Sequence, residues 1–285
     1  MSEQAGNDKA DHNGPDGRET QSGRHEAGRP DDSNPDSKAR FSDRVEAYAK
    51  YRPGYPAEAV DYVCEAAGLS AGSAAADLGA GTGIFSKLLL ERGVKVVAVE
   101  PNREMREAAE AALAGFEGFR SEDASAEATG LPDGSVDGIV CAQAFHWFDR
   151  EAARIEFDRI LKPGGRAALI WNARLTQGSA FLEQYEELLL RRGTDYSEVN
   201  HRNVSPDILH GFFKPGTLSE KRFPNRQTFD FEGLSGRVRS SSYVPAPGTP
   251  GYEPLMEELR EIFDRNQENG RVFFDYETEV YIGEV

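Results

Sequence analysis

The chain has 285 residues, and its 33 Lys and Arg residues against 49 Asp and Glu residues give a formal net charge of −16. This acidic balance argues against general binding to nucleic-acid backbones, because phosphate recognition needs clustered positive charge. The two cysteines, Cys64 and Cys141, lie far apart in apolar contexts, which argues against a disulfide framework and against a metal site.

The first 40 residues differ in composition from the rest of the chain. Residues 1–40 are rich in Gly, Asp, Asn, Ser, Arg, Glu and Pro and contain almost no large apolar side chain. Such a segment cannot bury enough surface to offset its ordering entropy, so we expect a disordered acidic and polar tail, followed by one domain over 41–285. The chain has no apolar run of about 20 residues and no signal-peptide apolar region, so we expect a cytoplasmic protein without a membrane partner.

From residue 41 onward, helical and strand patterns alternate, with Gly68 and Gly93 as helix ends. The run at 95–100 is apolar and β-branched, which is typical of a parallel strand buried on both faces. In chain order, the predicted helices are 44–50, 57–67, 84–92, 102–114 and 149–161. The predicted strands are 74–78, 95–100, 116–121, 135–142 and 166–171, with turns at 51–56 and 162–165. This alternation with short connections indicates a right-handed, doubly wound parallel sheet.

After Asn172 the rhythm changes. We expect an amphipathic helix at 181–192 and an irregular stretch at 195–213. An alternating strand at 219–231, a helix at 252–269 and a last alternating strand at 271–282 follow.

The most informative stretch is 75–83, which reads Ala-Ala-Asp-Leu-Gly-Ala-Gly-Thr-Gly. Asp77 lies near the end of an apolar strand, and Gly79, Gly81 and Gly83 follow at every second position, ahead of a helix. A strand that ends in a glycine-rich turn and opens a helix is a nucleotide-type binding loop, where missing side chains let the backbone approach a ligand closely. The spacing differs from the dinucleotide fingerprint, whose last gap is two residues. The alternative is a tight strand–helix turn whose glycines serve only packing.

Three further positions suit a bound nucleoside. Glu100 follows Gly79 by 21 positions, and an acidic residue about 20 positions past such a loop hydrogen-bonds the ribose hydroxyls. Met105 suits a sulfur contact with adenine or, equally, a place in the core. The carboxylate of Asp123 would accept from the adenine amino group while the Ala124 N–H donates to a ring nitrogen, although an Asp in a loop also serves turns.

Together these motifs resemble the class I methyltransferases that depend on S-adenosylmethionine (SAM), in the type 11 group. That group includes ubiquinone/menaquinone-biosynthesis-like and trans-aconitate-methyltransferase-like enzymes. The matching segments run from about residue 75 to 171 in the family's order and are 77–83, 99–102, 123–124, 131–137 and 161–165. The resemblance implies an α/β, Rossmann-like, doubly wound seven-stranded sheet, with six parallel strands, a last antiparallel strand and SAM over the C-terminal strand ends. The strands at 219–231 and 271–282 would be the last two.

The resemblance also implies roles for the loop. The helix start near residue 84 would face the methionine carboxylate of SAM, and Asp77 would accept from the methionine ammonium, directly or through water. The expected cofactor-binding residues are Asp77, Gly79, Gly81, Gly83, Glu100, Met105, Asp123, Ala124 and Gln143.

The flanking segments resemble a narrower subset of the family. This subset carries a Tyr-Arg-Pro-x-Tyr-Pro segment, matched at 51–56, an aromatic His-Trp pair, matched within 143–148, and an Arg-Ser-x-Ser-Tyr element, matched at 239–243. His146 is the candidate catalytic residue, either as a general base or as a packing partner of Trp147. The candidate acceptor contacts are Tyr51, Arg52, Trp147 and Tyr243.

Two wider sets of side chains suit an acceptor beside a sulfonium. Aromatic faces favour cations, although ordinary core packing explains each of these residues equally well. That set comprises Tyr48, Tyr51, Tyr55, Trp147 and Phe148. Guanidinium groups match an anionic acceptor, although most arginines are surface groups. That set comprises Arg52, Arg174, Arg202 and Arg239.

The favoured function is methyl transfer from SAM to an oxygen or carbon of a small-molecule acceptor, with release of S-adenosylhomocysteine and with 172–213 as an acceptor lid. One alternative is a nicotinamide-dependent oxidoreductase, which the glycine spacing and the lack of an obvious catalytic Lys/Tyr pair disfavour. A non-catalytic SAM-binding protein is the other alternative. We expect a monomer or a homodimer, with no nucleic-acid partner.

Overall fold

The structure, a computed structural model, describes residues 50–194, 196 and 204–285, all within one unit of the chain, Ser33–Val285. The predicted tail at 1–40 and the predicted helix at 44–50, apart from Lys50, lie outside the described residues. None of the helices in the described part is both long enough and apolar enough to cross a membrane.

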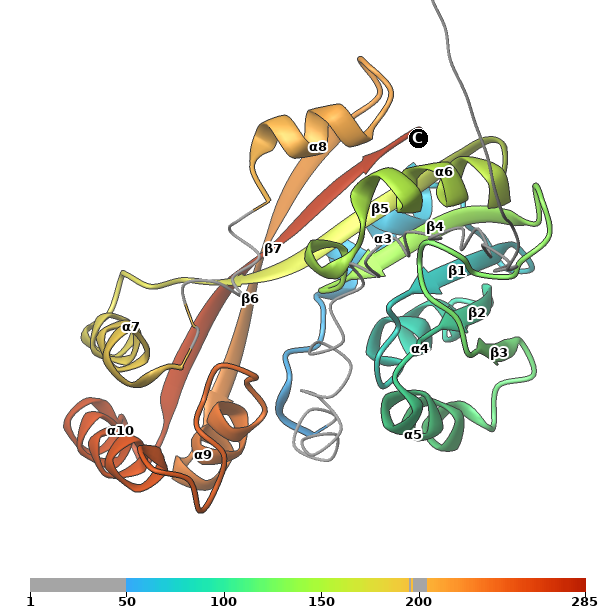
Figure 1. Ribbon diagram of the computed structural model, residues 1–285. Coiled ribbons are helices and arrows are strands. Elements are labelled where there is room, and N and C mark those ends of the chain that lie inside the picture. Colours follow the sequence, from blue (N-terminus) through green and yellow to red (C-terminus); the bar gives the residue numbers. More distant parts are fainter. Residues whose placement is uncertain (1–49, 195, 197–203) are drawn as a thin grey trace, which may run out of the picture. The chain divides into compact units, whose positions relative to one another are not determined.

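A seven-stranded sheet in the order β3-β2-β1-β4-β5-β7-β6 runs through the domain (Figure 1). Neighbouring strands from β3 to β5 pair in parallel, whereas β7 pairs antiparallel with both β5 and β6. The predicted fold class, with six parallel strands and one antiparallel strand, is therefore confirmed. The strands are β1 (Ala74–Leu78), β2 (Lys95–Val99), β3 (Phe119–Glu122), β4 (Val136–Ala142), β5 (Leu161–Arg174), β6 (Ser219–Phe229) and β7 (Val272–Gly283).

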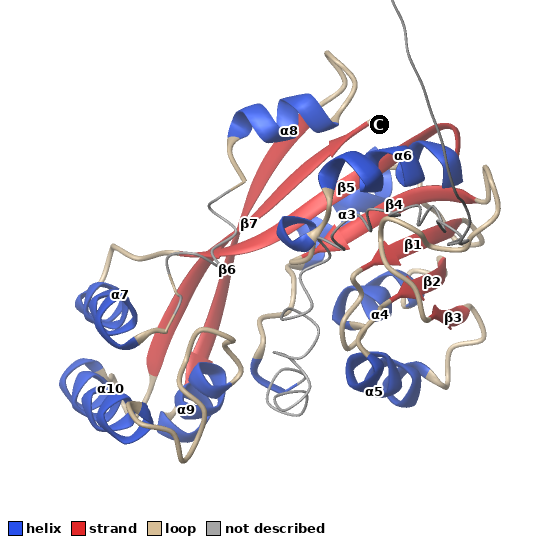
Figure 2. Cartoon of the chain, in the orientation of Figure 1, coloured by secondary structure: helices blue, strands red, loops and turns tan. Residues whose placement is uncertain are grey.

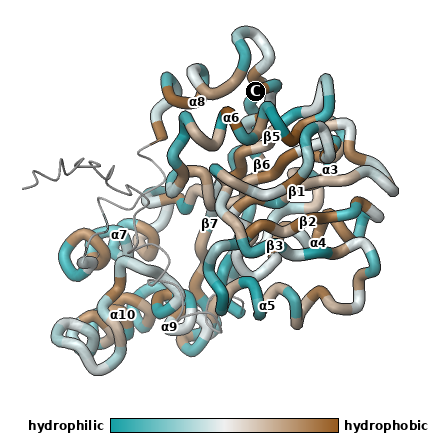
Figure 3. The backbone as a smooth tube through the Cα atoms, turned by 45° about the vertical axis from the view of Figure 1, so that its right-hand side comes forward, coloured by the Kyte–Doolittle hydropathy of each residue, from teal (hydrophilic) through white to brown (hydrophobic). Residues whose placement is uncertain are grey.

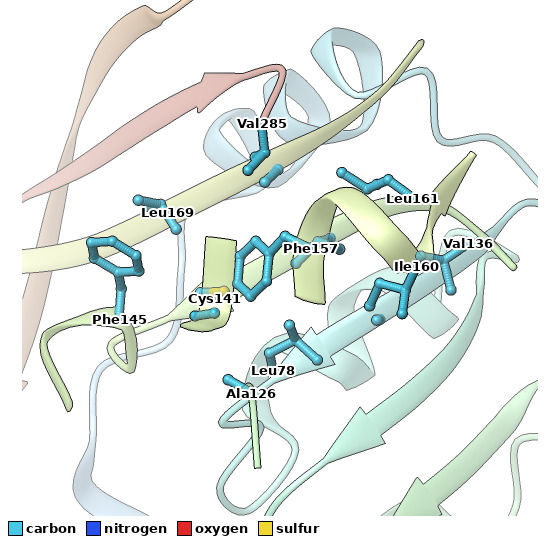
Figure 4. Packing of buried hydrophobic residues seen from close by; sticks show 14 of the residues in the cluster. Leu78, Ala126, Val136, Cys141, Phe145, Phe157, Ile160, Leu161, Leu169 and Val285 are labelled. Carbon is cyan, nitrogen blue, oxygen red and sulfur yellow. The ribbon is translucent and has the colours of Figure 1, made fainter. Parts of the chain in front are cut away.

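Helices cover both faces of the parallel part of the sheet (Figure 2). Successive strand side chains point to opposite faces, so each central strand contributes to two cores. In β4, Ile139 and Cys141 join a cluster with Phe157 (Figure 4), whereas Val140 between them joins a cluster with Val60. The helices are α3 (Ala57–Ala66), α4 (Ile84–Leu90), α5 (Arg103–Leu113) and α6 (Arg150–Ile160), with a short 3-10 helix, η1 (Phe145–Trp147).

A third hydrophobic cluster lies on the antiparallel part of the sheet. It joins α7 (Ala180–Arg192), α9 (Phe231–Arg239) and α10 (Tyr252–Asn266) to side chains of β6 and β7. Figure 1 shows these helices together beside one end of the two long strands, and Figure 3 shows hydrophobic and hydrophilic residues mixed within α7 and α10. This arrangement is typical of amphipathic helices that bury one face.

Two sequence predictions about helices are wrong. The stretch predicted as irregular contains α8 (Pro206–Phe212), which begins after Ser205 and buries Phe212 in the cluster with Phe157. The strand predicted to reach residue 231 ends at Phe229, and α9 follows, with Asp230 accepting from Gly233 N at 2.8 Å. Both helices are short, and short helices depend on tertiary packing more than on local propensity.

The fifth strand is also longer than predicted. It was expected at 166–171 after a turn at 162–165, but β5 spans Leu161–Arg174. Its last residue, Arg174, is opposite Tyr276 of β7. This pairing with a strand about 100 positions away extends β5 beyond its apolar run, so the local sequence did not reveal it.

Candidate functional site

The three loop glycines all adopt left-handed backbone conformations, with φ values of 69° at Gly79, 55° at Gly81 and 77° at Gly83. A Cβ on Gly79 would lie 2.5 Å from the Cβ of Ala144, and one on Gly83 would lie 2.7 Å from Cδ1 of Leu113. Both separations are shorter than real Cβ contacts. The loop therefore requires glycine for its backbone and for its close packing between the end of β4 and α5.

The carboxylate of Glu100 fixes the loop to the start of α5. Its Oε2 accepts from Gly81 N at 2.8 Å, and its Oε1 accepts from Asn102 N at 2.8 Å. Glu100 is buried directly after β2, where parallel strands of this fold present their ligand-facing ends. The sequence separation of 21 positions thus corresponds to direct contact between Glu100 and the loop.

Asp77 is almost fully buried beneath the same loop. Its Oδ2 accepts from Ser86 Oγ at 2.6 Å, whereas its Oδ1 has no hydrogen-bond partner among the described residues. Burial raises the pKa of Asp77 to about 7, the nearby Glu100 charge adds to this rise, and the Ser86 hydrogen bond opposes it. The hydroxyl of Thr82, also in the loop, is likewise buried without a partner among the described residues.

The beginning of α5 connects Glu100 to Asp123. Asn102 caps the helix by accepting from Met105 N at 2.9 Å, and Met105 itself is buried. Arg106 donates to the Glu100 carbonyl at 2.8 Å and to both carboxylate oxygens of Asp123 at 3.0 and 2.9 Å. This fork holds the exposed Asp123 carboxylate, and with it the segment leading to Ala124, at the end of β3. Arg106 is a residue that the sequence analysis missed.

The end of β4 carries a strained residue and the His-Trp pair. Gln143 has a φ of 62°, a conformation that a non-glycine residue adopts at a cost of about 1–3 kcal/mol and mostly at functional sites. Its N–H donates to Ile170 O at 2.8 Å. His146 Nδ1 accepts from Trp171 Nε1 at 3.4 Å, and its ring centroid lies 4.9 Å from that of Trp147.

Comparisons with known proteins agree with this geometry. A family model described as a methyltransferase domain matches residues 76–169. An uncharacterized methyltransferase of Mycobacterium tuberculosis is 43% identical over 172 residues, which are 60% of this chain and 66%, just under two thirds, of that relative. A methyltransferase-like protein of Schizosaccharomyces pombe is 29% identical over 86% of this chain and 94% of its own.

A solved structure from Anaeromyxobacter dehalogenans, described as a type II methyltransferase, shares the fold. It has a TM-score of 0.64 and 24% identity, and the match covers 82% of this chain and 98% of that one. The chain is thus similar to methyltransferases over residues 76–169 and shares the fold of the class I enzymes that depend on SAM.

The residues of this loop suit the methionyl and ribosyl parts of SAM chemically. SAM presents an ammonium that needs an acceptor, and the unpartnered Oδ1 of Asp77 is such an acceptor. A side chain at Gly79 would collide with Ala144 and one at Gly83 with Leu113, so the loop has no room for side chains at these two positions. Glu100 supplies the carboxylate that suits ribose hydroxyls.

The segment 51–56 connects this loop to α9. The ring of Tyr55 meets Phe85 of α4 edge-on, with centroids 5.0 Å apart. The Gly54 carbonyl accepts from Asn172 Nδ2 at 3.1 Å, and Arg52 Nη2 donates to Ser240 O at 2.9 Å. The segment therefore runs from the helix that follows the glycine loop, past the end of β5, to the C-terminal end of α9.

The structure separates the predicted acceptor residues into two groups. Trp147 lies with His146 at the end of β4. Tyr51 packs on α9, where a Cβ on Gly236 would lie only 2.2 Å from its ring, and Arg52 lies close enough to Tyr243 to lower the pKa of that phenol.

The predicted arginines have different outcomes. Arg174 lies beside Tyr185, with its Cζ 4.8 Å from the ring centroid, whereas Arg239 is exposed and donates to Ser235 O within α9. Arg202 and Tyr48 lie outside the described residues. Arg237 is buried and was missed, because α9 itself was not predicted.

Proposed function

We propose that this methyltransferase transfers the methyl group of SAM to an oxygen or carbon of a small-molecule acceptor and releases S-adenosylhomocysteine. The observation that carries the proposal is the buried Oδ1 of Asp77 beneath a loop of crowded glycines, with Glu100 bound to the same loop. The cofactor, when bound, supplies the electrophilic methyl group. The protein binds, orients and excludes water, and orientation alone supplies roughly 7–11 kcal/mol in favourable model reactions.

We assign the cofactor contacts by element. Asp77 would hold the ammonium, Glu100 the ribose, and Met105 and the Asp123–Ala124 segment the adenine. The Arg106 fork supports this by fixing Asp123, and the strained Gln143 supports a ligand contact at the end of β4. The loop glycines would give the cofactor close access to the backbone.

His146 is proposed to orient the acceptor. Trp171 donates to Nδ1, so a neutral imidazole carries its proton on Nε2 and acts there as a donor. A general base at Nε2 would require the opposite tautomer, which would break that hydrogen bond. An acceptor that is already ionised, such as a carboxylate, needs no base.

Residues 41–285 are proposed as the methyltransferase domain, with the acceptor side contributed partly by 172–213. The described part of that segment includes Arg174 and α7, whose Glu186 forms an ion pair with Arg174. These contacts support a role for this segment in acceptor binding.

The first prediction tests the cofactor site. Gly79→Ala should weaken S-adenosylhomocysteine binding by at least about 100-fold in calorimetry, because the new methyl group would lie 2.5 Å from Ala144 Cβ in a loop that needs a φ of 69°. Gly216→Ala is the matched control. Gly216 has a φ of 80° but has nothing within 4 Å of a Cβ, so it shares the backbone strain without the steric contact.

The same experiment separates the alternatives. Absence of binding to the unmodified protein, or equal affinities for the two alanine variants, would reject the assigned site. Binding of NADH in a fluorescence titration would favour the oxidoreductase. A screen of metabolite pools with radiolabelled SAM then tests turnover, and binding without labelled product from any pool would favour the non-catalytic alternative.

A further inference from the structure

Three arginines from separate parts of the chain converge on Tyr243. They are Arg52 from the segment 51–56, Arg174 from the end of β5 and Arg237 from α9. Burial raises the pKa of Tyr243, but the charges of Arg237, Arg52 and Arg174 outweigh it and leave the pKa below its usual value. A chain with a net charge of −16 thus gathers three arginines that are partly or fully buried near one phenol.

Arg237 is the most buried of the three, with 6% of its surface exposed. Its Nη1 donates to Ser241 Oγ at 2.9 Å, and more weakly to Ser240 Oγ at 3.4 Å. Among the described residues its Nε has no hydrogen-bond partner and its guanidinium has no ion pair. Buried charges are ordinarily paired, so a guanidinium with an unused donor indicates a missing anion.

The groups around these arginines include one carboxylate and several phenols. Arg174 pairs with Glu186 and donates to Tyr196 Oη at 3.0 Å. Arg237 faces the hydroxyl-bearing rings of Tyr185 and Tyr276, and burial lowers its pKa less than these tyrosines and Tyr243 raise it. Glu186 thus pairs with Arg174, while the tyrosines add hydrogen-bonding groups without adding charge in their neutral form.

The cluster is joined to the cofactor loop by a short stretch of backbone. Tyr55 packs on Phe85, two residues after Gly83, while Arg52, three residues before Tyr55, donates to Ser240 O. Asn172, two residues before Arg174, donates to the carbonyl of Gly54, which lies between Arg52 and Tyr55 in the sequence. These contacts connect the arginine cluster with the elements that flank the cofactor loop.

We propose that Arg52, Arg174, Arg237 and Tyr243 bind an oxyanion group of the methyl acceptor. The acceptor is then a small organic anion that carries a carboxylate or a phosphate, since the planar guanidinium fork matches both groups. This inference rests on the proposed function, because it names the substrate class of the same site.

The test uses the protein saturated with S-adenosylhomocysteine and measures binding of three probes by calorimetry. Succinate and glycerol 3-phosphate represent the two oxyanions, and the uncharged succinamide is the control. We expect one or both anions to bind and succinamide not to bind. Arg237→Gln should weaken anion binding about tenfold or more, while affinity for S-adenosylhomocysteine changes less than about twofold. Arg226→Gln, at an exposed arginine that pairs with Asp275, should change neither affinity.

A second variant guards against misfolding of Arg237→Gln. Arg52 is only partly buried, so Arg52→Gln is expected to fold and to weaken the anion as well. Binding of succinate alone assigns a carboxylate, and binding of glycerol 3-phosphate alone assigns a phosphate. Normal affinity for S-adenosylhomocysteine with no anion binding, or with anion affinity unchanged in both variants, overturns the inference and leaves the proposed function standing. Loss of S-adenosylhomocysteine binding by the unmodified protein would instead reject the proposed function.

Discussion

Asp77 shows how one residue links burial to ligand chemistry. A buried carboxylate with one oxygen that has no partner among the described residues is costly, and burial raises its pKa to about 7. Because the folded-state pKa lies above the usual 3.8, this group lowers the stability of the unliganded protein as the pH rises from 3.8 to about 7. A ligand ammonium would reverse that cost by favouring the ionised form.

The residue-scale prediction is a pH-dependent affinity. S-adenosylhomocysteine should bind about tenfold more weakly at pH 6 than at pH 8, because at pH 6 most Asp77 is protonated and cannot pair with the ammonium. Calorimetry at the two pH values measures this difference. Asp77→Asn should bind weakly at both, so a variant that retains the full pH dependence would show that another group titrates.

Glu156 in α6 is a buried carboxylate that is held by several hydrogen bonds. It is buried and accepts from Thr129 N at 2.8 Å, from Thr129 Oγ1 at 2.5 Å and from Arg159 Nε at 2.8 Å. The Arg159 hydrogen bond is the main cause that lowers the pKa of Glu156 from 4.5 to about 2, with Thr129 adding to it against the opposing effect of burial. Glu156 therefore fixes Thr129, in the loop before β4, to helix α6.

The element-scale prediction concerns acid stability. Because the folded-state pKa is lowered, the stabilisation by Glu156 is complete above pH 4.5 and is lost as the pH falls toward 2. A shift of this size corresponds to about 3 kcal/mol of unfolding free energy. Urea unfolding at pH 7 should show Glu156→Gln destabilised by about 2–3 kcal/mol. Asp158→Asn, an exposed neighbour with an ion pair at 3.9 Å, should cost less than about 0.5 kcal/mol. Equal losses in the two variants would contradict the assignment.

A polar network connects distant parts of the whole molecule. Asn172 Oδ1 accepts from the fully buried Thr278 Oγ1 at 2.5 Å and from Asn225 Nδ2 at 3.1 Å, and both asparagines donate to the Gly54 carbonyl. Strands β5, β6 and β7 are thereby joined to the segment 51–56. This segment carries Arg52 and Tyr55, so the network aligns the arginine cluster with the cofactor loop.

The whole-molecule prediction tests that network. Asn172→Ala should lower the unfolding free energy by about 2 kcal/mol, since it leaves the buried Thr278 hydroxyl without its acceptor. Asn225→Ala should cost less, because Gly54 keeps its bond to Asn172. Denaturant unfolding measures both values. If the two losses are equal, or if that of Asn225→Ala is the larger, the network does not act through Asn172.

The sequence alone predicted the glycine loop and the strand that leads into it. The strand at Ala74–Leu78 was predicted with its observed bounds, and Glu100, identified by its separation from the glycines, contacts the loop directly. These features are local: apolar runs form buried strands, and only glycine adopts the loop's positive φ values without cost. The 21 positions between Gly79 and Glu100 contain one helix and one strand, so this separation is a local feature that the sequence shows directly.

Only the tertiary structure brought the arginine cluster together. Arg52, Arg174 and Arg237 are more than 60 positions apart from one another, and no periodicity brings them together. Their meeting depends on the pairing of β5 with β7 and on α9, a short helix stabilised by packing. The sequence does not show which arginines are buried. Arg237 and Arg239 could be distinguished only in the fold, where Arg237 is buried and Arg239 is exposed.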